Sequence, residues 1–288
     1  MPIVVENLSF TYGKKSPFEK KALDNVSFTV SDGEFVGIVG CTGSGKSTLI
    51  QHLNGLIKLT DGKIVVDEID LSARKPDLQK LRKKIGMLFQ YPEYQLFAET
   101  VLDDVKFGPR NFGMSDEEAA QNAERAIRMV GLDFDKIKER SPIELSGGEK
   151  RRVAVAGVLS YNPDFLILDE PTAGLDPAGK RDMLDLLTSL RASGAVKTVI
   201  MVSHNMDEIA EYADRVIALS DGKKICDSTP EKFFYDEYED AFGLALPHAV
   251  AITKKLASRG IILPSRPLTR QSLTDSVSSY FSGKGGTN

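Results

Sequence analysis

The sequence has few cysteines and no strong excess of charge of either sign. Cys41 and Cys226 are the only two cysteines among 288 residues, so we expect no disulfide scaffold and favour a reducing cytoplasm. There are 37 basic side chains and 41 acidic ones, which gives a formal net charge of −4. With this balance the chain as a whole has no excess of positive charge to attract nucleic acid, so we expect no nucleic-acid partner.

Long hydrophobic runs are also missing. The longest apolar stretch, residues 241–252, contains Pro247 and His248 and falls short of the roughly 20 residues that cross a bilayer. The first ten residues include Glu6 and have neither a basic region nor a long apolar run, so we expect no signal peptide. Any role at a membrane is therefore expected to come through a partner protein.

What is present is the pattern of an α/β protein, long enough for one large domain or two modest ones. Short apolar runs of strand type alternate with segments of helical periodicity. We expect strands at residues 3–12, 22–30, 35–39, 165–168, 198–202 and 215–219, and helices at 46–54 and around 183–190. Because strand, loop and helix follow one another in this order, we predict a parallel sheet.

The middle of the chain departs from this pattern. Residues 100–107 have a helical pattern, and Ser115 and Glu118 have the spacing of a capping box ahead of a second helix. The apolar side chains that follow lie on one face of that helix. We therefore predict a helical insertion over residues 91–161.

After about residue 227 the sequence changes character again. A helix is expected over 248–259, ended by Gly260, and a second apolar stripe follows at Leu273, Val277, Tyr280 and Phe281. From residue 240 onward, six basic residues stand against two acidic ones, a charge that suits either anionic lipid or a solvated pair of packing helices. We predict a main domain at 1–227 and a C-terminal extension at 228–288 that packs in a dimer or on a partner.

A glycine-rich loop follows the strand at 35–39 and fits the phosphate-loop pattern G-x-x-x-x-G-K-[ST]. Its residues are Gly40, Cys41, Thr42, Gly43, Ser44, Gly45, Lys46 and Ser47, with Thr48 next. Glycine lets successive backbone N–H groups turn toward phosphate oxygens, and the following helix points its positive end at them. In such loops the lysine, here Lys46, meets the β- and γ-phosphates, and the hydroxyl of Ser47 meets Mg²⁺.

Two carboxylates, Asp169 and Glu170, end the apolar strand at 165–168. Asp169 is suited to binding Mg²⁺, and Glu170 is suited to act as a general base that polarises an attacking water. A solvated strand end is the alternative. The phosphate loop on the same chain favours the catalytic interpretation.

A second anion-binding segment lies about 105 residues after the first. Ser146, Gly147 and Gly148 begin a predicted helix that carries Lys150, Arg151 and Arg152, and such a helix start binds anions. Both segments can serve one nucleotide only if two chains face each other head to tail. At this point the sequence resembles the ABC ATPase family, whose signature segment acts across a dimer in this way.

That resemblance extends over nearly the whole chain. It implies that Tyr12 stacks on adenine, that Gln90 links the core to the helical subdomain and senses Mg²⁺ and water, that Asp176 belongs to the D-loop, and that His204 contacts the γ-phosphate. Each residue also has an ordinary interpretation. Tyr12 would then be a strand aromatic, Gln90 a surface amide, and His204 a satisfied core or loop histidine.

A narrower resemblance is to the ATPase subunits of energy-coupling factor transporters, which import vitamins and micronutrients. The segment 89–97, with the sequence FQYPEYQLF, is similar to theirs. Residues 49–56 and 170–177, together with the tail at 245–267, resemble the second of the two ATPases in that family. Cys41 departs from the histidine often found there, and Glu149 replaces the commoner glutamine of the ABC signature. Both positions are expected to leave hydrolysis intact.

The resemblance implies a RecA-like parallel sheet with an antiparallel β subdomain and an α-helical subdomain. It implies an ATPase that uses ATP and Mg²⁺, pairs with a homologous ATPase, and works with a polytopic membrane protein and, indirectly, with substrate-binding membrane proteins. A heterodimer is favoured and a homodimer stays open. The chain is then peripheral on the cytoplasmic face of the membrane. The alternatives are the motor of another ABC importer and, less favoured, a soluble ABC protein that acts on ribosomes or DNA.

The aromatic segment after Gln90 has two interpretations. Tyr91, Tyr94, Leu96 and Phe97 would grip helices of a membrane subunit if they are exposed. They would form the core of the helical subdomain if they are buried. The sequence by itself leaves both possibilities open.

Overall fold

The computed structural model describes residues 2–284. Its larger sheet has six strands in the order β10-β9-β3-β8-β7-β6, and all neighbouring pairs are parallel except β10 with β9. The strands are β3 (Phe35–Val39), β6 (Ile85–Leu88), β7 (Phe165–Asp169), β8 (Thr198–Val202), β9 (Arg215–Ser220) and β10 (Lys223–Ser228). The predicted α/β class with a parallel sheet is therefore confirmed.

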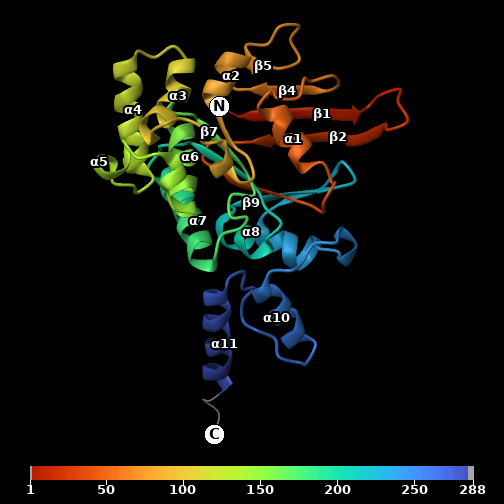
Figure 1. The fold of residues 1–288 in the computed structure, drawn as a ribbon. Coiled ribbons are helices and arrows are strands. Elements are labelled where there is room, and N and C mark those ends of the chain that lie inside the picture. The colour runs from red at the N-terminus through yellow and green to blue at the C-terminus, as the bar shows by residue number, and fades with distance from the viewer. Residues whose placement is uncertain (1, 285–288) are drawn as a thin grey trace.

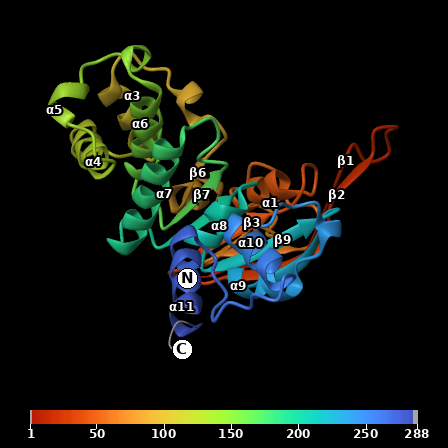
Figure 2. The ribbon, with the colours of Figure 1, turned by 90° about the horizontal axis from the view of Figure 1, so that it is seen from below.

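A second, four-stranded sheet has the order β2-β1-β4-β5 and is antiparallel. Its strands are β1 (Ile3–Tyr12), β2 (Lys20–Val30), β4 (Lys63–Val66) and β5 (Ile69–Asp70). The β1–β2 hairpin extends from one side of the molecule (Figures 1 and 2). This sheet supplies the antiparallel β subdomain that the resemblance implied.

Four helices connect these strands. They are α1 (Lys46–Leu53), α2 (Leu78–Lys84), α7 (Pro177–Ala192) and α8 (Met206–Tyr212). The sequence pattern placed α1 and α7 but missed α2, α8, β4, β5, β6 and β10. Those elements have between two and seven residues each, which is too short for a period of 2 or 3.6 to become evident.

A group of helices lies on the opposite side of the molecule from the β1–β2 hairpin (Figures 1 and 2). It contains η1 (Pro92–Gln95), α3 (Val101–Asn111), α4 (Asp116–Met129), α5 (Phe134–Ile137), η2 (Pro142–Glu144) and α6 (Gly147–Leu159). The capping box of Ser115 and Glu118 is present at the start of α4. Helix α3 runs four residues beyond the predicted end and contains Pro109.

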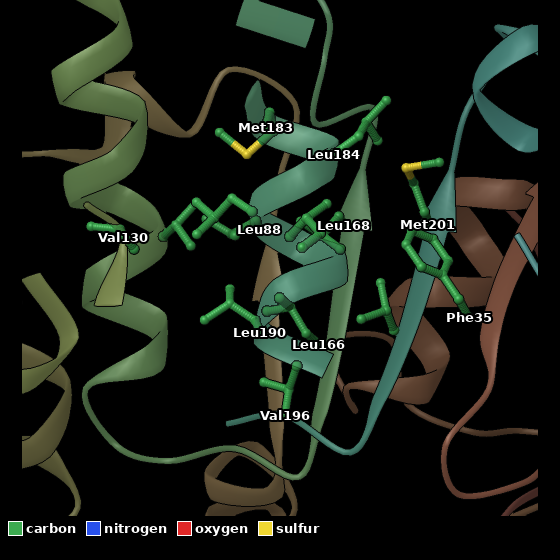
Figure 3. Close-up of a cluster of buried hydrophobic side chains, with 14 of the residues drawn as sticks. Phe35, Leu88, Val130, Leu166, Leu168, Met183, Leu184, Leu190, Val196 and Met201 are labelled. Atoms are coloured by element: carbon green, nitrogen blue, oxygen red, sulfur yellow. The ribbon is translucent and has the colours of Figure 1, made fainter. Parts of the chain in front are cut away.

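The six-stranded sheet is buried on both faces, as parallel sheets are. Along β7, Leu166 and Leu168 belong to one hydrophobic cluster, while Phe165 and Ile167 belong to the other. Figure 3 shows the first cluster, in which strand residues meet Met183, Leu184 and Leu190 of α7. The second cluster joins the same strands to α1 and the antiparallel sheet. The ends of the strands, where the site lies, are held by both clusters.

The C-terminal part lies below this body in Figure 1. Its elements are α9 (Pro230–Lys232), η3 (Phe233–Glu237), η4 (Asp240–Phe242), α10 (His248–Ala257) and α11 (Arg270–Lys284). Val250 of α10 is fully buried, whereas Phe281 of the predicted apolar stripe is 61% exposed. The stripe is therefore only partly covered within the chain. The division at residue 227 stays a prediction.

No helix among residues 2–284 combines the length and the apolar character that crossing a bilayer requires.

Candidate functional site

The phosphate loop connects β3 to α1 and is tightly packed at two of its glycines. Gly40 and Gly45 have φ values of 153° and 103°. A Cβ atom at Gly40 would lie 2.3 Å from the carbonyl oxygen of Leu219, and one at Gly45 would lie 2.5 Å from that of Ala22. Only glycine fits these positions. The loop geometry is therefore set by β9 and β2, which press against it.

Lys46 begins α1, and its ammonium group lies inside the loop. Its Nζ donates to the carbonyl oxygens of Gly40 and Cys41 at 2.6 and 3.0 Å. Burial lowers the pKa of Lys46, and the nearby Glu170 and Asp169 carboxylates oppose this effect. The cation is thus held at the place where a phosphate would enter, and it is bound to carbonyl oxygens that a phosphate oxygen can replace.

A cavity of about 240 Å³ opens beside the loop and is lined by Tyr12, Lys20, Ala22, Gly43, Gly45, Lys46, Ser47 and Thr48. The Tyr12 hydroxyl lies 3.3 Å from Thr48 Oγ1, and the Tyr12 side chain is 42% exposed. Tyr12 also meets the edge of Phe10, with ring centroids 4.8 Å apart. An exposed aromatic ring fixed at the rim of a phosphate cavity suits a base-stacking platform.

Ser47 and Asp169 meet at the end of β7. Ser47 Oγ donates to Asp169 Oδ2 at 3.3 Å. Burial raises the pKa of Asp169, the Ser47 hydrogen bond works against this, and the neighbouring Glu170 charge adds to it. A carboxylate whose charge is disfavoured by burial gains from a cation, and the hydroxyl and carboxylate oxygens are hard ligands of the type that Mg²⁺ takes. The residues therefore fit the predicted ion.

Glu170 and His204 form a pair that the sequence did not reveal. His204 Nδ1 lies 2.9 Å from Glu170 Oε2. Glu170 adopts a left-handed backbone conformation with φ of 50°, which is uncommon for a residue with a side chain and is concentrated at functional sites. The His204 side chain is 70% exposed, so the interpretation as a core histidine is wrong.

The signature segment is built differently from the phosphate loop. Ser146 caps α6 and forms a reciprocal capping box with Glu149, whose pKa is lowered by the backbone and side-chain hydrogen bonds from Ser146. Gly147 and Gly148 are exposed, and a Cβ atom at either would meet nothing within 4 Å. Asp176 caps α7 by accepting a hydrogen bond from the Gly179 amide at 2.7 Å.

Gln90 and the aromatic segment that follows it are at the surface. Tyr94 and Phe97 are 84% and 66% exposed, and Tyr91 is 39% exposed. Leu96 is partly buried against the core. The interpretation of the three aromatics as core residues is therefore wrong.

The buried guanidinium of Arg151 holds this segment in place. Its Nε and Nη2 atoms donate to the two Glu93 carboxylate oxygens at 3.1 and 3.2 Å, and its Nη1 donates to the Ala173 carbonyl at 2.9 Å. Arg151 lies on α6, Glu93 in η1, and Ala173 between β7 and α7. This single side chain therefore links the signature helix, the aromatic segment and the loop that follows Asp169 and Glu170.

The C-terminal extension reaches the phosphate loop at Cys41. The Cys41 thiol donates to the Phe242 carbonyl oxygen at 2.9 Å, and Gly243 passes so close that a Cβ atom there would lie 2.7 Å from Cys41 Sγ. Phe242 in turn stacks against Phe233, with the ring planes 4° apart. No sequence motif foretold this contact, since it joins residues 201 positions apart.

The structure thus gathers most of the predicted residues into one cluster. Tyr12, the loop from Gly40 to Thr48, Asp169, Glu170 and His204 are connected by the contacts above. The chain's own signature residues, from Ser146 to Gly148, share none of those contacts. Lys20 and Ala22 also line the cavity and were not predicted. Only the pairing of β2 with β1 brings them there.

Comparisons with known proteins agree with this site. The ABC transporter family profile matches residues 23–173. The energy-coupling factor transporter ATP-binding protein EcfA2 of Symbiobacterium thermophilum is 50% identical over 287 residues, which cover 99% of both chains. The protein of the same name from Clostridium acetobutylicum is 48% identical over 90% of this chain and 91% of its own.

Solved structures show the same fold. CbiO1 of Clostridium perfringens, described as part of the ABC transporter complex CbiONQ, superimposes with a TM-score of 0.73 at 34% identity, over 89% of this chain and 94% of that one. A dimeric ATP-binding cassette bound to ADP and Pi in a post-hydrolysis state gives a TM-score of 0.69 at 32% identity, over 79% of this chain and 98% of that one. This chain is therefore an ABC ATPase, and it belongs to the family of energy-coupling factor transporter ATP-binding proteins.

Proposed function

We propose that this chain is the motor subunit of an importer for vitamins or other micronutrients, and that its site residues act as the contacts above indicate. The proposal is carried by one observation: the same chain contains a tightly packed phosphate loop and an exposed signature segment. Each segment is half of a nucleotide site. A head-to-tail pair of ATPases completes both halves.

ATP binding is assigned to the cavity beside the loop. Tyr12 at its rim stacks on the base, and the loop amides and Lys46 bind the phosphates. The Lys46 ammonium exchanges its two carbonyl partners for phosphate oxygens, which are stronger acceptors because they are charged. Mg²⁺, held through Ser47, Asp169 and Gln90, supplies charge neutralisation at the β- and γ-phosphates when bound.

Hydrolysis is assigned to Glu170 and His204. Glu170 accepts the proton of the attacking water, and His204 donates to the γ-phosphate. Their 2.9 Å contact keeps both side chains at the same end of the site. Phosphoryl transfer needs little beyond this positioning and charge stabilisation.

The second ATPase supplies the missing half of the site. Its signature serine and glycines close over the nucleotide of this chain, while Ser146, Gly147 and Gly148 close over the partner's nucleotide, with Asp176 at the junction. ATP thereby favours the closed pair and hydrolysis favours the open one, which is a ligand-driven shift between two states. A homologous but different ATPase is the favoured partner, and a second copy of this chain is the alternative.

The output surface is assigned to the exposed aromatic segment, whose Tyr94 and Phe97 are the most exposed members. Apolar side chains of this size, exposed together, are typical of a protein interface. They would receive helices of a polytopic membrane protein, which holds the ATPase at the cytoplasmic face of the membrane. Motors of other ABC importers are the second candidate, because they present the same two half-sites.

Copurification tests this proposal. The tagged chain is expressed in its own cells, membranes are dissolved in mild detergent, and the copurifying proteins are identified. A second ATPase, a polytopic membrane protein and small substrate-binding membrane proteins are expected. Membrane subunits together with a separate soluble binding protein would favour another ABC importer, and ribosomal or DNA-bound partners without a membrane protein would contradict transport.

A matched pair of variants locates the docking surface. Tyr94→Ser with Phe97→Ser is expected to lose the membrane protein but keep the second ATPase. Phe18→Ser is the control, because Phe18 is at least as exposed, at 86%, but lies in the β1–β2 loop at the other side of the molecule (Figure 1). If both variants lose the membrane protein equally, the aromatic segment is not the docking surface.

A further inference from the structure

Lys20 has a position in the nucleotide cavity that no motif explains. It is the first residue of β2 and pairs directly with Tyr12 of β1. Residues directly opposite in an antiparallel pair point to the same face of the sheet. Both side chains line the 240 Å³ cavity together with the phosphate loop. Lys20 therefore flanks the cavity on the side of β2, next to Tyr12.

The Lys20 ammonium lies close to the loop backbone. A Cβ atom built on Gly43 would lie 3.8 Å from Lys20 Nζ and would meet nothing nearer. Gly43 is exposed and has φ of 83°, a backbone conformation that favours glycine. A lysine carries its ammonium group on a flexible four-carbon stem, so the Lys20 ammonium can turn toward an anion held by the loop.

The neighbouring lysine is used differently. Lys21 Nζ bonds Asp24 Oδ1 at 2.5 Å, and that contact lowers the pKa of Asp24. Lys20 forms no ion pair within residues 2–284. Of two adjacent cations on one strand, the one that faces the cavity is thus left without a carboxylate. An unpaired ammonium at the mouth of an anion site attracts the anion it faces.

We propose that Lys20 is a second phosphate-binding cation, which approaches the nucleotide from β2 while Lys46 approaches from α1. The proposal rests on the assignment of the cavity to ATP. Lys46 is half-buried and fixed by two carbonyl oxygens, whereas Lys20 is exposed. Lys20 is therefore the cation that meets the phosphates first, and its contact is the more sensitive to salt.

The test compares adjacent lysines in the full-length chain. Lys20→Gln and Lys21→Gln are titrated with fluorescent ADP and ATP analogues. Lys20→Gln is expected to raise the Kd about tenfold, as the loss of one charge-assisted hydrogen bond does, and to flatten its dependence on salt. Lys20→Arg is expected to restore most of the affinity. Lys21→Gln is expected to bind as the parent chain does, because its cation is engaged by Asp24.

Three outcomes would overturn the proposal. These are an unchanged Kd for Lys20→Gln, an equal loss for Lys21→Gln, or a lower unfolding temperature of Lys20→Gln without nucleotide that accounts for the loss. Lys46→Ala separates the proposal from the assignment of the site. If Lys46→Ala loses nucleotide binding while Lys20→Gln does not, only the role of Lys20 fails. If Lys46→Ala still binds nucleotide, the phosphate-loop assignment itself fails.

Discussion

The glycines of the phosphate loop and those of the signature segment lie in opposite environments. A side chain at Gly40 or Gly45 would collide with the backbone of this same chain, whereas a side chain at Gly147 or Gly148 would meet nothing. Intramolecular packing thus requires the first pair and tolerates change at the second. If Gly147 and Gly148 must be glycine, the reason has to lie outside the chain. A half-site that closes over a partner's nucleotide would be such a reason.

Polar contacts differ between the two regions in the same way. Around the phosphate loop, Lys46, Ser47 and Asp169 bind one another or the loop backbone. In the signature segment, the Ser146 hydroxyl hydrogen-bonds, among residues 2–284, only with Glu149 of its own helix. The phosphate loop is therefore preorganised by tertiary contacts, whereas the Ser146 side chain is held by a local capping box.

The largest expected effect tests whether the two regions meet across a dimer. Glu170→Gln removes the general base while keeping the size of the side chain, so hydrolysis is expected to fall by about 10²–10⁴-fold. ATP binding is expected to survive, and the closed pair is expected to persist. The measurements are phosphate release and the size of the purified complex with ATP. Normal turnover would show that Glu170 is not the base.

The next prediction compares the stability of variants at a phosphate-loop glycine and at a signature glycine. Gly45→Ala is expected to destabilise the fold by about 2–4 kcal/mol, because it adds a collision to a left-handed backbone. Gly148→Ala lies in the first turn of α6 and is expected to leave stability unchanged or to raise it by up to about 1 kcal/mol. Thermal unfolding without nucleotide measures both variants.

ATP hydrolysis provides a second measurement that distinguishes the signature glycines from those of the phosphate loop. Gly148→Ala is expected to reduce ATP hydrolysis by the assembled complex about a hundredfold. The added methyl group would lie where the two ATPases meet and would displace the phosphate of the partner's nucleotide. Nucleotide binding to the phosphate loop of the same chain should be unaffected. If Gly148→Ala instead unfolds the chain, or if it hydrolyses normally, the signature glycines are not reserved for a partner.

A smaller effect concerns the loop at Cys41. This thiol is exposed and lies in the phosphate loop, so bound ATP should shield it from alkylation. With ATP at ten times its Kd, the labelling rate is expected to fall about tenfold. Cys226 is an internal control, because burial raises its pKa to about 12 and keeps it unreactive. Equal rates with and without ATP would contradict the position of Cys41 beside the phosphates.

The smallest effect concerns the helix that carries Lys46. His52 of α1 is buried, its Nδ1 bonds the Thr48 carbonyl at 2.7 Å, and its Nε2 has no partner among the described residues. Burial lowers its pKa from the ordinary 6.5. The unfolded chain therefore binds a proton that the folded chain does not, and stability falls as the pH drops below about 6.5.

His52→Phe is expected to weaken this acid destabilisation, since phenylalanine cannot titrate and still packs against Phe10. Urea unfolding at pH 7.5 and pH 5.5 measures the difference between the two proteins. The same pH dependence in both would show that another group is responsible. The signature region contains no comparable buried histidine.

Local sequence determined several features of this protein. Successive apolar residues defined β3 and β8 to the residue, and the capping box at Ser115 and the Ser146-Gly147-Gly148 segment marked the starts of two helices. The phosphate-loop and signature motifs named the ABC ATPase class, because each consists of a few consecutive residues whose backbone performs the chemistry. Short-range rules were sufficient at these places.

Tertiary structure decided the rest. The contact of His204 with Glu170, the burial of Arg151 against Glu93, and the approach of Gly243 to Cys41 each join distant parts of the chain. The position of Lys20 in the cavity depends on the pairing of β2 with β1, whereas its sequence neighbour Lys21 is engaged by Asp24. No local pattern distinguishes these two lysines, because the difference between them arises only when the strand is paired and one face of it meets the phosphate loop.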